Sequence, residues 1–93
     1  MESNKINQQQ KICYVSFVAD INPITTEVLL HNVFTLMGQG YNHLYFLFST
    51  VGGNVDNGIT LYNILRGLPI EITMHNSGSV NSIGNVIFLA GKK

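Results

Sequence analysis

The feature that most constrains the fold is a continuous apolar run, Leu-Tyr-Phe-Leu-Phe, at residues 44–48. Glycines bracket this run, with Gly40 before it and Gly52-Gly53 after it. A short apolar run between glycine turns is typical of a strand that is buried on both faces in a parallel sheet. We therefore expect Leu44–Phe48 to be such a strand.

Two other segments have strand patterns. Ile12–Val18 is rich in β-branched and aromatic residues, which favour strands. Ile70–Met74 alternates apolar and polar side chains, so one of its faces is expected to be solvated or covered by a partner.

Helical patterns separate these strands. Asn22-Pro23 pairs a capping residue with a proline at the first helical position, although Thr25 or Thr26 could cap equally well. This first helix is expected to stop at Gly38 and Gly40. A second helix is expected over Asp56–Arg66. The apolar positions of the two helices are Leu29, Leu30, Val33, Phe34, Leu36 and Met37 in the first and Ile59, Leu61, Tyr62, Ile64 and Leu65 in the second.

The last fifth of the chain combines a turn rich in Gly and Ser, residues 76–82, with an apolar run at residues 85–90. We expect the turn to open a buried helix whose first residue is Ser82. The element order is then β-α-β-α-β-α, which predicts an α/β fold with parallel strands and right-handed crossovers. Ligands bind such sheets at the carboxyl ends of the strands, so the serine turn and the Gly52-Gly53 turn are expected to face each other.

Ser82 is the candidate nucleophile of this predicted site. The backbone N–H groups of Gly53 and Ile83 could stabilise a developing oxyanion. A structural interpretation remains open, because serine is a common helix cap and Gly52-Gly53 could be only a tight turn between strand and helix.

None of the three histidines is a convincing base for this serine. His31 and His43 are expected to be solvated or packed, and His75 is expected on a strand whose pleat sets its side chain. Asp56 is most simply a residue of the first turn of the second helix, stabilised by the helix dipole. The residues therefore give a nucleophile without a triad.

No cofactor or metal is expected. The glycine spacing of Gly53–Gly58 is that of a phosphate-binding loop, but Ile59 stands where such a loop needs lysine. Cys13 is the single cysteine, and no Cys/His spacing resembles a zinc site.

Composition limits the partners further. Five Lys and Arg balance five Asp and Glu, so no charge field favours nucleic acid or a membrane surface. Only 11% of residues are charged and 45% are apolar, which suggests that further sequence or neighbouring subunits cover much of the surface. Residues 1–11 are polar and are expected to form a flexible tail, with no apolar core of a signal peptide and no membrane span in the chain. We expect a cytoplasmic protein.

Four motifs carry a family resemblance: Gly52-Gly53-Asn-Val-x-x-Gly58, Leu61-Tyr62, Gly78-Ser-Val-Asn-Ser82-Ile-Gly84 and Phe88-Leu-Ala-Gly91. In this order and at this separation they resemble the proteolytic subunit of the Clp protease, a member of the crotonase-like superfamily. The resemblance spans roughly residues 12–93 and would make this segment the amino-terminal half of a Clp-protease-like domain.

The resemblance implies a homo-oligomeric ring and a serine endopeptidase that receives unfolded protein from an ATP-dependent unfoldase. Ser82 would be the nucleophile, Gly53 and Ile83 would supply the oxyanion-hole amides, and Gly52-Gly53 would lie beside the bound peptide. The histidine and aspartate of the family's triad follow the serine and would fall beyond Lys93. The 93-residue chain alone is therefore expected to be inactive.

Two departures from the family pattern keep alternatives open. Thr50-Val51 stands where the family has Ser-Pro, and Val80-Asn81 replaces two small residues before the serine. One alternative is a noncatalytic oligomerisation subunit that pairs with an active paralogue. The other is an acyl-thioester binder of the crotonase class, which uses similar paired amides.

Overall fold

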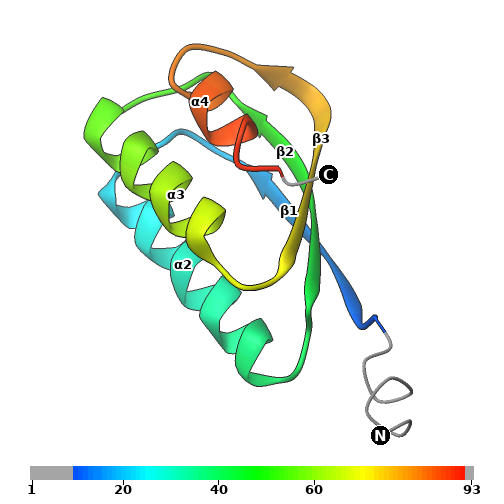
Figure 1. The fold of residues 1–93 in the computed structure, drawn as a ribbon. Coiled ribbons are helices and arrows are strands. Elements are labelled where there is room, and N and C mark those ends of the chain that lie inside the picture. The colour runs from blue at the N-terminus through cyan, green and yellow to red at the C-terminus, as the bar shows by residue number, and fades with distance from the viewer. Residues whose placement is uncertain (1–9, 92–93) are drawn as a thin grey trace, which may run out of the picture.

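A computed structural model of the chain describes residues 10–91. Its elements in chain order are β1 Ile12–Val18, α2 Pro23–Gly38, β2 His43–Thr50, α3 Val55–Gly67, β3 Glu71–Val80 and α4 Gly84–Phe88. The strands form one parallel sheet in the order β1-β2-β3 (Figure 1). The predicted α/β fold with its β-α-β-α-β-α order is confirmed.

The helices cover one face of this sheet. Figure 1 shows α2 and α3 side by side along that face, with α4 near the carboxyl ends of β2 and β3. Alternate side chains of β2 are buried beneath them: Leu44, Phe46, Phe48 and Thr50. The other face, which carries Tyr45 and Leu47, is only half-buried. The prediction that this strand is buried on both faces is therefore wrong for residues 10–91, because successive right-handed crossovers in one direction place their helices on the same side.

The core lies between the sheet and the helices. The helix side chains with the least exposure are Leu29, Val33, Leu61, Leu65 and Ile87. Phe34 and Ile59, two of the predicted apolar positions, are 51% and 44% exposed. Each lies roughly a quarter to nearly half a turn away from the buried positions of its helix, so its side chain faces outward.

The amino end of α2 follows its local sequence. Asn22 is the cap, and its Oδ1 accepts a hydrogen bond of 2.9 Å from the Thr25 N–H. In return, the Asn22 N–H donates to the Thr25 hydroxyl at 3.0 Å. Of the three candidate caps, Asn22, Thr25 and Thr26, the cap is therefore Asn22, and Thr25 completes a capping box with it.

The third strand is longer than the sequence predicted. β3 includes residues 76–80, where a turn was expected. Pairing is regular as far as Phe48 and Asn76 and then resumes at Thr50 and Val80, so β3 carries two extra residues in a bulge. Within it, the Ser79 N–H donates to the Ser49 hydroxyl at 3.1 Å. Asn and Gly disfavour strands and Ser is common in turns, which explains why the pattern predicts a turn.

The expected flexible tail, residues 1–11, lies mostly outside the described residues. Lys11 is the last residue before β1, and its N–H donates to Asn42 Oδ1 at 2.8 Å. Its ammonium group donates to the Gln39 carbonyl at 2.8 Å and lies 4.5 Å from the centre of the Tyr41 ring. Lys11 therefore ties the start of β1 to the connection between α2 and β2.

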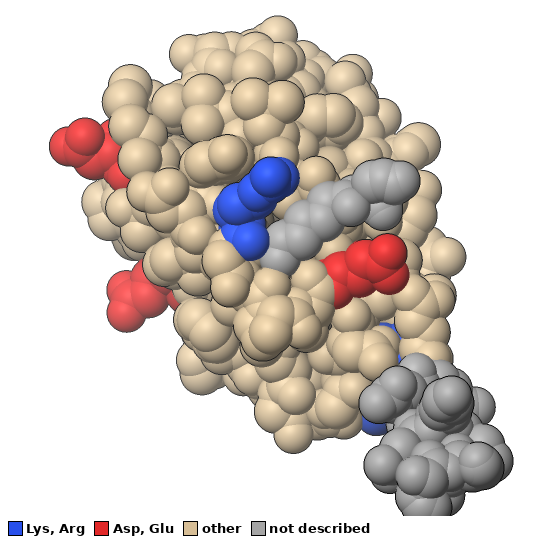
Figure 2. All heavy atoms as spheres, viewed as in Figure 1, with Lys and Arg blue, Asp and Glu red and all other residues tan. Residues whose placement is uncertain are grey.

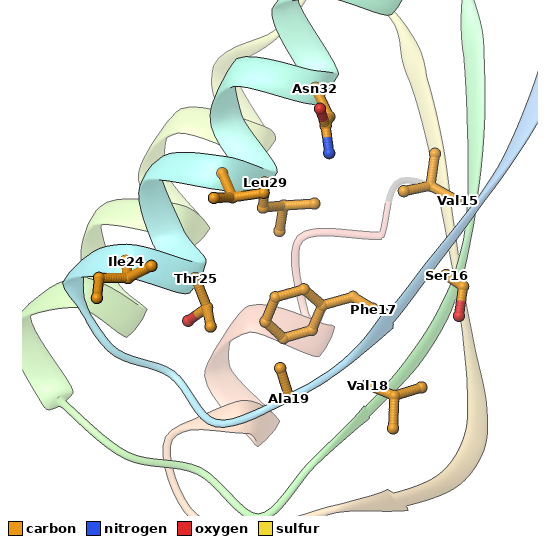
Figure 3. Close-up of a pocket in the computed structure, with 10 residues that line it drawn as sticks. Val15, Ser16, Phe17, Val18, Ala19, Ile24, Thr25, Leu29 and Asn32 are labelled. Carbon is orange, nitrogen blue, oxygen red and sulfur yellow. The ribbon is translucent and has the colours of Figure 1, made fainter.

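An open apolar groove of about 280 Å³ runs between β1 and α2. Figure 3 shows the Phe17 ring directed from β1 toward α2, with Ile24 and Leu29 on the helix. Ile24 is 74% exposed and Val18 is 68% exposed. An apolar surface is therefore left open along this edge of residues 10–91.

Charged side chains are few on the face drawn in Figure 2, and they stand apart from one another. No patch of a single charge sign forms on that face. Between residues 10 and 91, no helix combines the length and the hydrophobicity needed to cross a membrane.

Candidate functional site

Two loops meet at the carboxyl ends of β2 and β3. A Cβ atom built on Gly52, in the loop after β2, would lie 2.6 Å from the Ser82 Cβ and 3.2 Å from its Oγ. Side chains do not approach so closely, so only a glycine at position 52 lets the two backbones come together. The Gly52-Gly53 turn and the serine turn face each other, as the sequence predicted.

The conformation of the glycine turn is set by Ile21, which follows β1. Gly52 and Gly53 have φ angles of +104° and +149°. The Ile21 N–H donates to the Gly52 carbonyl at 2.9 Å, and the Asn54 N–H donates to the Ile21 carbonyl at 2.8 Å. A Cβ atom on Gly53 would overlap that Ile21 carbonyl. These two hydrogen bonds thus hold the turn against the loop that follows β1.

Ser82 lies in the turn before α4, not in the helix. Its φ angle is +54°, the only positive value among the non-glycine residues from 10 to 91. A residue in this left-handed conformation cannot be part of an α-helix, so the prediction that the helix begins at Ser82 is wrong, and α4 begins at Gly84. Ile83 occupies the cap position, and the exposed Ser82 hydroxyl makes no hydrogen bond to residues 10–91. The hydroxyl is therefore not a helix cap.

The two amides singled out from the sequence are unpaired in the described part of the chain. Neither the Gly53 N–H nor the Ile83 N–H donates to an acceptor within residues 10–91. Gly53 is exposed, whereas the Ile83 side chain is 8% exposed. An unpaired N–H in a residue as buried as Ile83 is uncommon, because most buried N–H groups have partners. Both amides are available to a bound acceptor.

The histidines do not meet Ser82. His75 is exposed on β3, on the sheet face away from the helices, with its ring 6.2 Å from that of Tyr45. His43 begins β2, and its Nε2 lies 2.8 Å from the Thr73 hydroxyl. His31 is exposed on α2. No His, Asp or Glu of residues 10–91 forms a hydrogen bond with Ser82, and no group of three or more His, Cys, Asp and Glu in that range could hold a metal ion.

Sequence reasoning missed two residues that build this site. Ile21 holds the glycine turn from the loop after β1, and the Thr50 hydroxyl accepts a 3.0 Å hydrogen bond from the Gly52 N–H. The role of Ile21 depends on a pairing between distant segments and leaves no local pattern. Thr50 does leave one, because a threonine two residues before a glycine favours a hydroxyl-closed turn.

Replacing Gly58 with alanine is expected to lower the free energy of unfolding by about 1–3 kcal/mol. Gly58 lies inside α3, where alanine normally stabilises a helix. Here a Cβ atom would overlap the side chain of Ile83, which is β-branched, buried and unable to turn away easily. Urea denaturation of the Gly58→Ala variant measures this loss.

Gly67→Ala is the matched control in the same helix, because no heavy atom lies within 4 Å of the added Cβ. This variant is expected to be as stable as the parent chain or up to about 1 kcal/mol more stable. Equal effects of the two substitutions would contradict the close packing of α3 on Ile83.

The fold of this chain is similar to that of proteins whose structures have been solved. Two solved structures of ClpP1 from Listeria monocytogenes, one of a point mutant, resemble the chain with TM-scores of 0.79 and 0.80 at 20% sequence identity. They cover 98% and 100% of this chain, whereas the chain spans only 52% and 53% of theirs. No curated protein sequence matches.

The sequence itself fits one family. The family model of Clp protease matches residues 2–93, nearly the whole chain. It takes in both glycine-containing loops and the serine between β3 and α4. The chain belongs to the Clp protease family.

Proposed function

We propose that this chain forms part of a Clp-type serine endopeptidase in which Ser82 is the nucleophile. The observation that carries the proposal is the backbone of Ser82, which is exposed, left-handed and pressed against Gly52. A strained non-glycine residue costs about 1–3 kcal/mol, and such residues cluster at active sites. A serine with an unbonded hydroxyl at this position is suited to attack a carbonyl carbon.

The two unpaired amides would stabilise the tetrahedral intermediate of peptide hydrolysis. As Ser82 Oγ bonds to the carbonyl carbon of a peptide, its proton passes to a base and the carbonyl oxygen becomes negative. The N–H groups of Gly53 and Ile83 would donate to that oxygen, and collapse of the intermediate would release the amine with the proton from the base. The base and its orienting acid would come from the part of the fold that this chain does not span.

The substrate is proposed to be unfolded protein or peptide, lying beside the exposed Gly52-Gly53 turn. Homo-oligomeric ring assembly and delivery of substrate by an ATP-dependent unfoldase are part of the same proposal, as is a cytoplasmic location. Membership of the Clp protease family supports these points. The exposed apolar side chains along β1 and α2 fit a chain that is covered in a larger assembly.

A noncatalytic subunit is the second candidate. It is favoured by the absence of a base near Ser82 within residues 10–91, together with the polar Asn81 before it. Mixing the chain with a full-length Clp subunit and measuring peptide hydrolysis separates the two candidates. Ser82→Ala lowers the activity of the mixture only if Ser82 itself reacts.

Phosphonylation by a fluorophosphonate probe tests the proposed nucleophile. The chain alone is expected to react at Ser82 at least about 10³-fold more slowly than an intact serine peptidase, because residues 10–91 place no base within hydrogen-bond distance of Ser82. Mass spectrometry of a proteolytic digest identifies the modified residue. Ser82→Ala is expected to abolish the modification.

Ser77→Ala is the control, because Ser77 is an exposed serine of the neighbouring bulge in β3. Its substitution is expected to leave the rate unchanged. A modification found mainly at Ser77 or at another serine would remove Ser82 as the nucleophile.

A further inference from the structure

Thr50 is the residue at which both loops of the site are joined. It is the last residue of β2 and is 4% exposed. Its carbonyl accepts a 3.1 Å hydrogen bond from the Asn81 N–H, one residue before Ser82. The bulge in β3 makes this bond possible, because its extra residues bring Val80 opposite Thr50. The backbone of Thr50 thus fixes the serine loop.

The hydroxyl of Thr50 fixes the other loop. Thr50 Oγ1 accepts a hydrogen bond of 3.0 Å from the Gly52 N–H in a buried position. This bond holds Gly52 at its φ of +104°, the conformation in which it abuts Ser82. A buried N–H left without this acceptor would favour another turn conformation.

The methyl group of Thr50 completes the arrangement. A Cβ atom built on Gly84, the first residue of α4, would lie 2.5 Å from Thr50 Cγ2. The methyl group therefore packs directly against the start of α4. Because a β-branched side chain has few allowed rotamers, the hydroxyl and the methyl hold fixed directions. Threonine alone among the residue types supplies both at this position.

We propose that Thr50 is a positioning residue of the reaction, whose hydroxyl sets the Gly52-Gly53 turn against Ser82. The inference rests on the proposed function of Ser82 and adds a residue that makes no hydrogen bond to Ser82 within residues 10–91. Thr50 would act by fixing the position of the Gly53 N–H relative to Ser82. A small displacement of such a group is enough to slow a reaction by about 10²-fold.

Two substitutions separate the hydroxyl from the methyl group. Thr50→Val keeps the shape and removes the acceptor, and it is expected to slow phosphonylation of Ser82 by about tenfold or more. Thr50→Ser keeps the acceptor and removes the methyl, and its rate is expected to stay within about twofold of the parent chain. Hydrogen exchange of the Gly52 amide, followed by NMR, is expected to speed up in Thr50→Val and not in Thr50→Ser.

Thr26→Val is the matched control. Thr26 is a second buried threonine, 5% exposed in α2, and its hydroxyl has no hydrogen-bond partner within residues 10–91. The same loss of a hydroxyl there is expected to leave both the phosphonylation rate and Gly52 exchange unchanged. An equal slowing by Thr26→Val and Thr50→Val would overturn the proposal, because it would reflect stability alone.

The remaining outcomes are also decisive. Equal rates and equal Gly52 exchange in Thr50→Val and the parent chain overturn the positioning role. If Ser82 is never modified in the parent chain, the proposed nucleophile fails, but the NMR measurements still decide about Thr50. In that case the NMR chemical shifts of the Ser82 and Gly53 amides decide. If they change in Thr50→Val and stay like those of the parent chain in Thr50→Ser, they support the positioning of the two loops by the hydroxyl. If they are unchanged in both variants, they refute it.

Discussion

Replacing Gly53 with alanine is expected to lower the free energy of unfolding by about 3 kcal/mol. The added Cβ would overlap the carbonyl of Ile21, which is backbone and cannot turn away as a side chain does. The φ of +149° adds strain that any L-residue would meet. The loop must therefore leave Ile21, and the bridge between these residues must open. Urea denaturation monitored by circular dichroism measures the loss.

Gly38→Ala is the control for this prediction. Gly38 ends α2, and no heavy atom lies within 4 Å of a Cβ built there. This substitution is expected to leave stability unchanged or to raise it by up to about 1 kcal/mol. If Gly53→Ala unfolds at the same urea concentration as Gly38→Ala, the glycine turn is not held by Ile21 as described.

The parts of the fold that the sequence predicts well are those decided by neighbours in the chain. Asn22-Pro23 starts α2 because the cap, the proline and Thr25 are within one turn of each other. A five-residue apolar run predicts the central strand, and α3 extends one residue beyond each predicted end. Asp56 lies in the first turn of α3, as predicted.

The parts that the sequence predicts poorly depend on contacts between distant segments. The residues after Met74 have turn-like propensities, yet they pair with β2 because Ser49 and Thr50 supply bonds that local propensity does not include. For the same reason the local sequence predicts a helix that begins at Ser82, whereas α4 begins at Gly84. The left-handed backbone of Ser82 lies directly against Gly52, and this contact with a distant loop leaves no pattern in the sequence around Ser82.

The features of the candidate site likewise divide into those that the sequence predicts and those that depend on contacts between distant segments. The proximity of the two loops was predictable, since both follow parallel strands of one sheet. The roles of Ile21 and Thr50 were not, because each depends on which hydrogen bond a particular group makes after folding. That Gly53 and Ile83 donate to a bound oxyanion stays a prediction until a ligand or a reaction tests it.

Replacing Phe46 with alanine is expected to have the largest effect on stability, a loss of about 3–5 kcal/mol. Phe46 is 0% exposed in the central strand, paired with Val15 on one side and Met74 on the other. The cavity would lie beneath the helices, where the sheet cannot collapse to fill it. A chain of this size has a total stability of about 5–14 kcal/mol, so the variant would lose about a fifth of it or more.

Phe34→Ala is the matched control, because this phenylalanine of α2 is 51% exposed. Its substitution is expected to change the free energy of unfolding by no more than about 0.5 kcal/mol. Similar losses for the two phenylalanines in urea denaturation would show that the core is not where the structure places it.

Since Thr50 ends the strand that contains Phe46, the site depends on this core. Phosphonylation of Ser82 in Phe46→Ala should therefore fall over the same range of urea concentration as the circular dichroism signal of the fold.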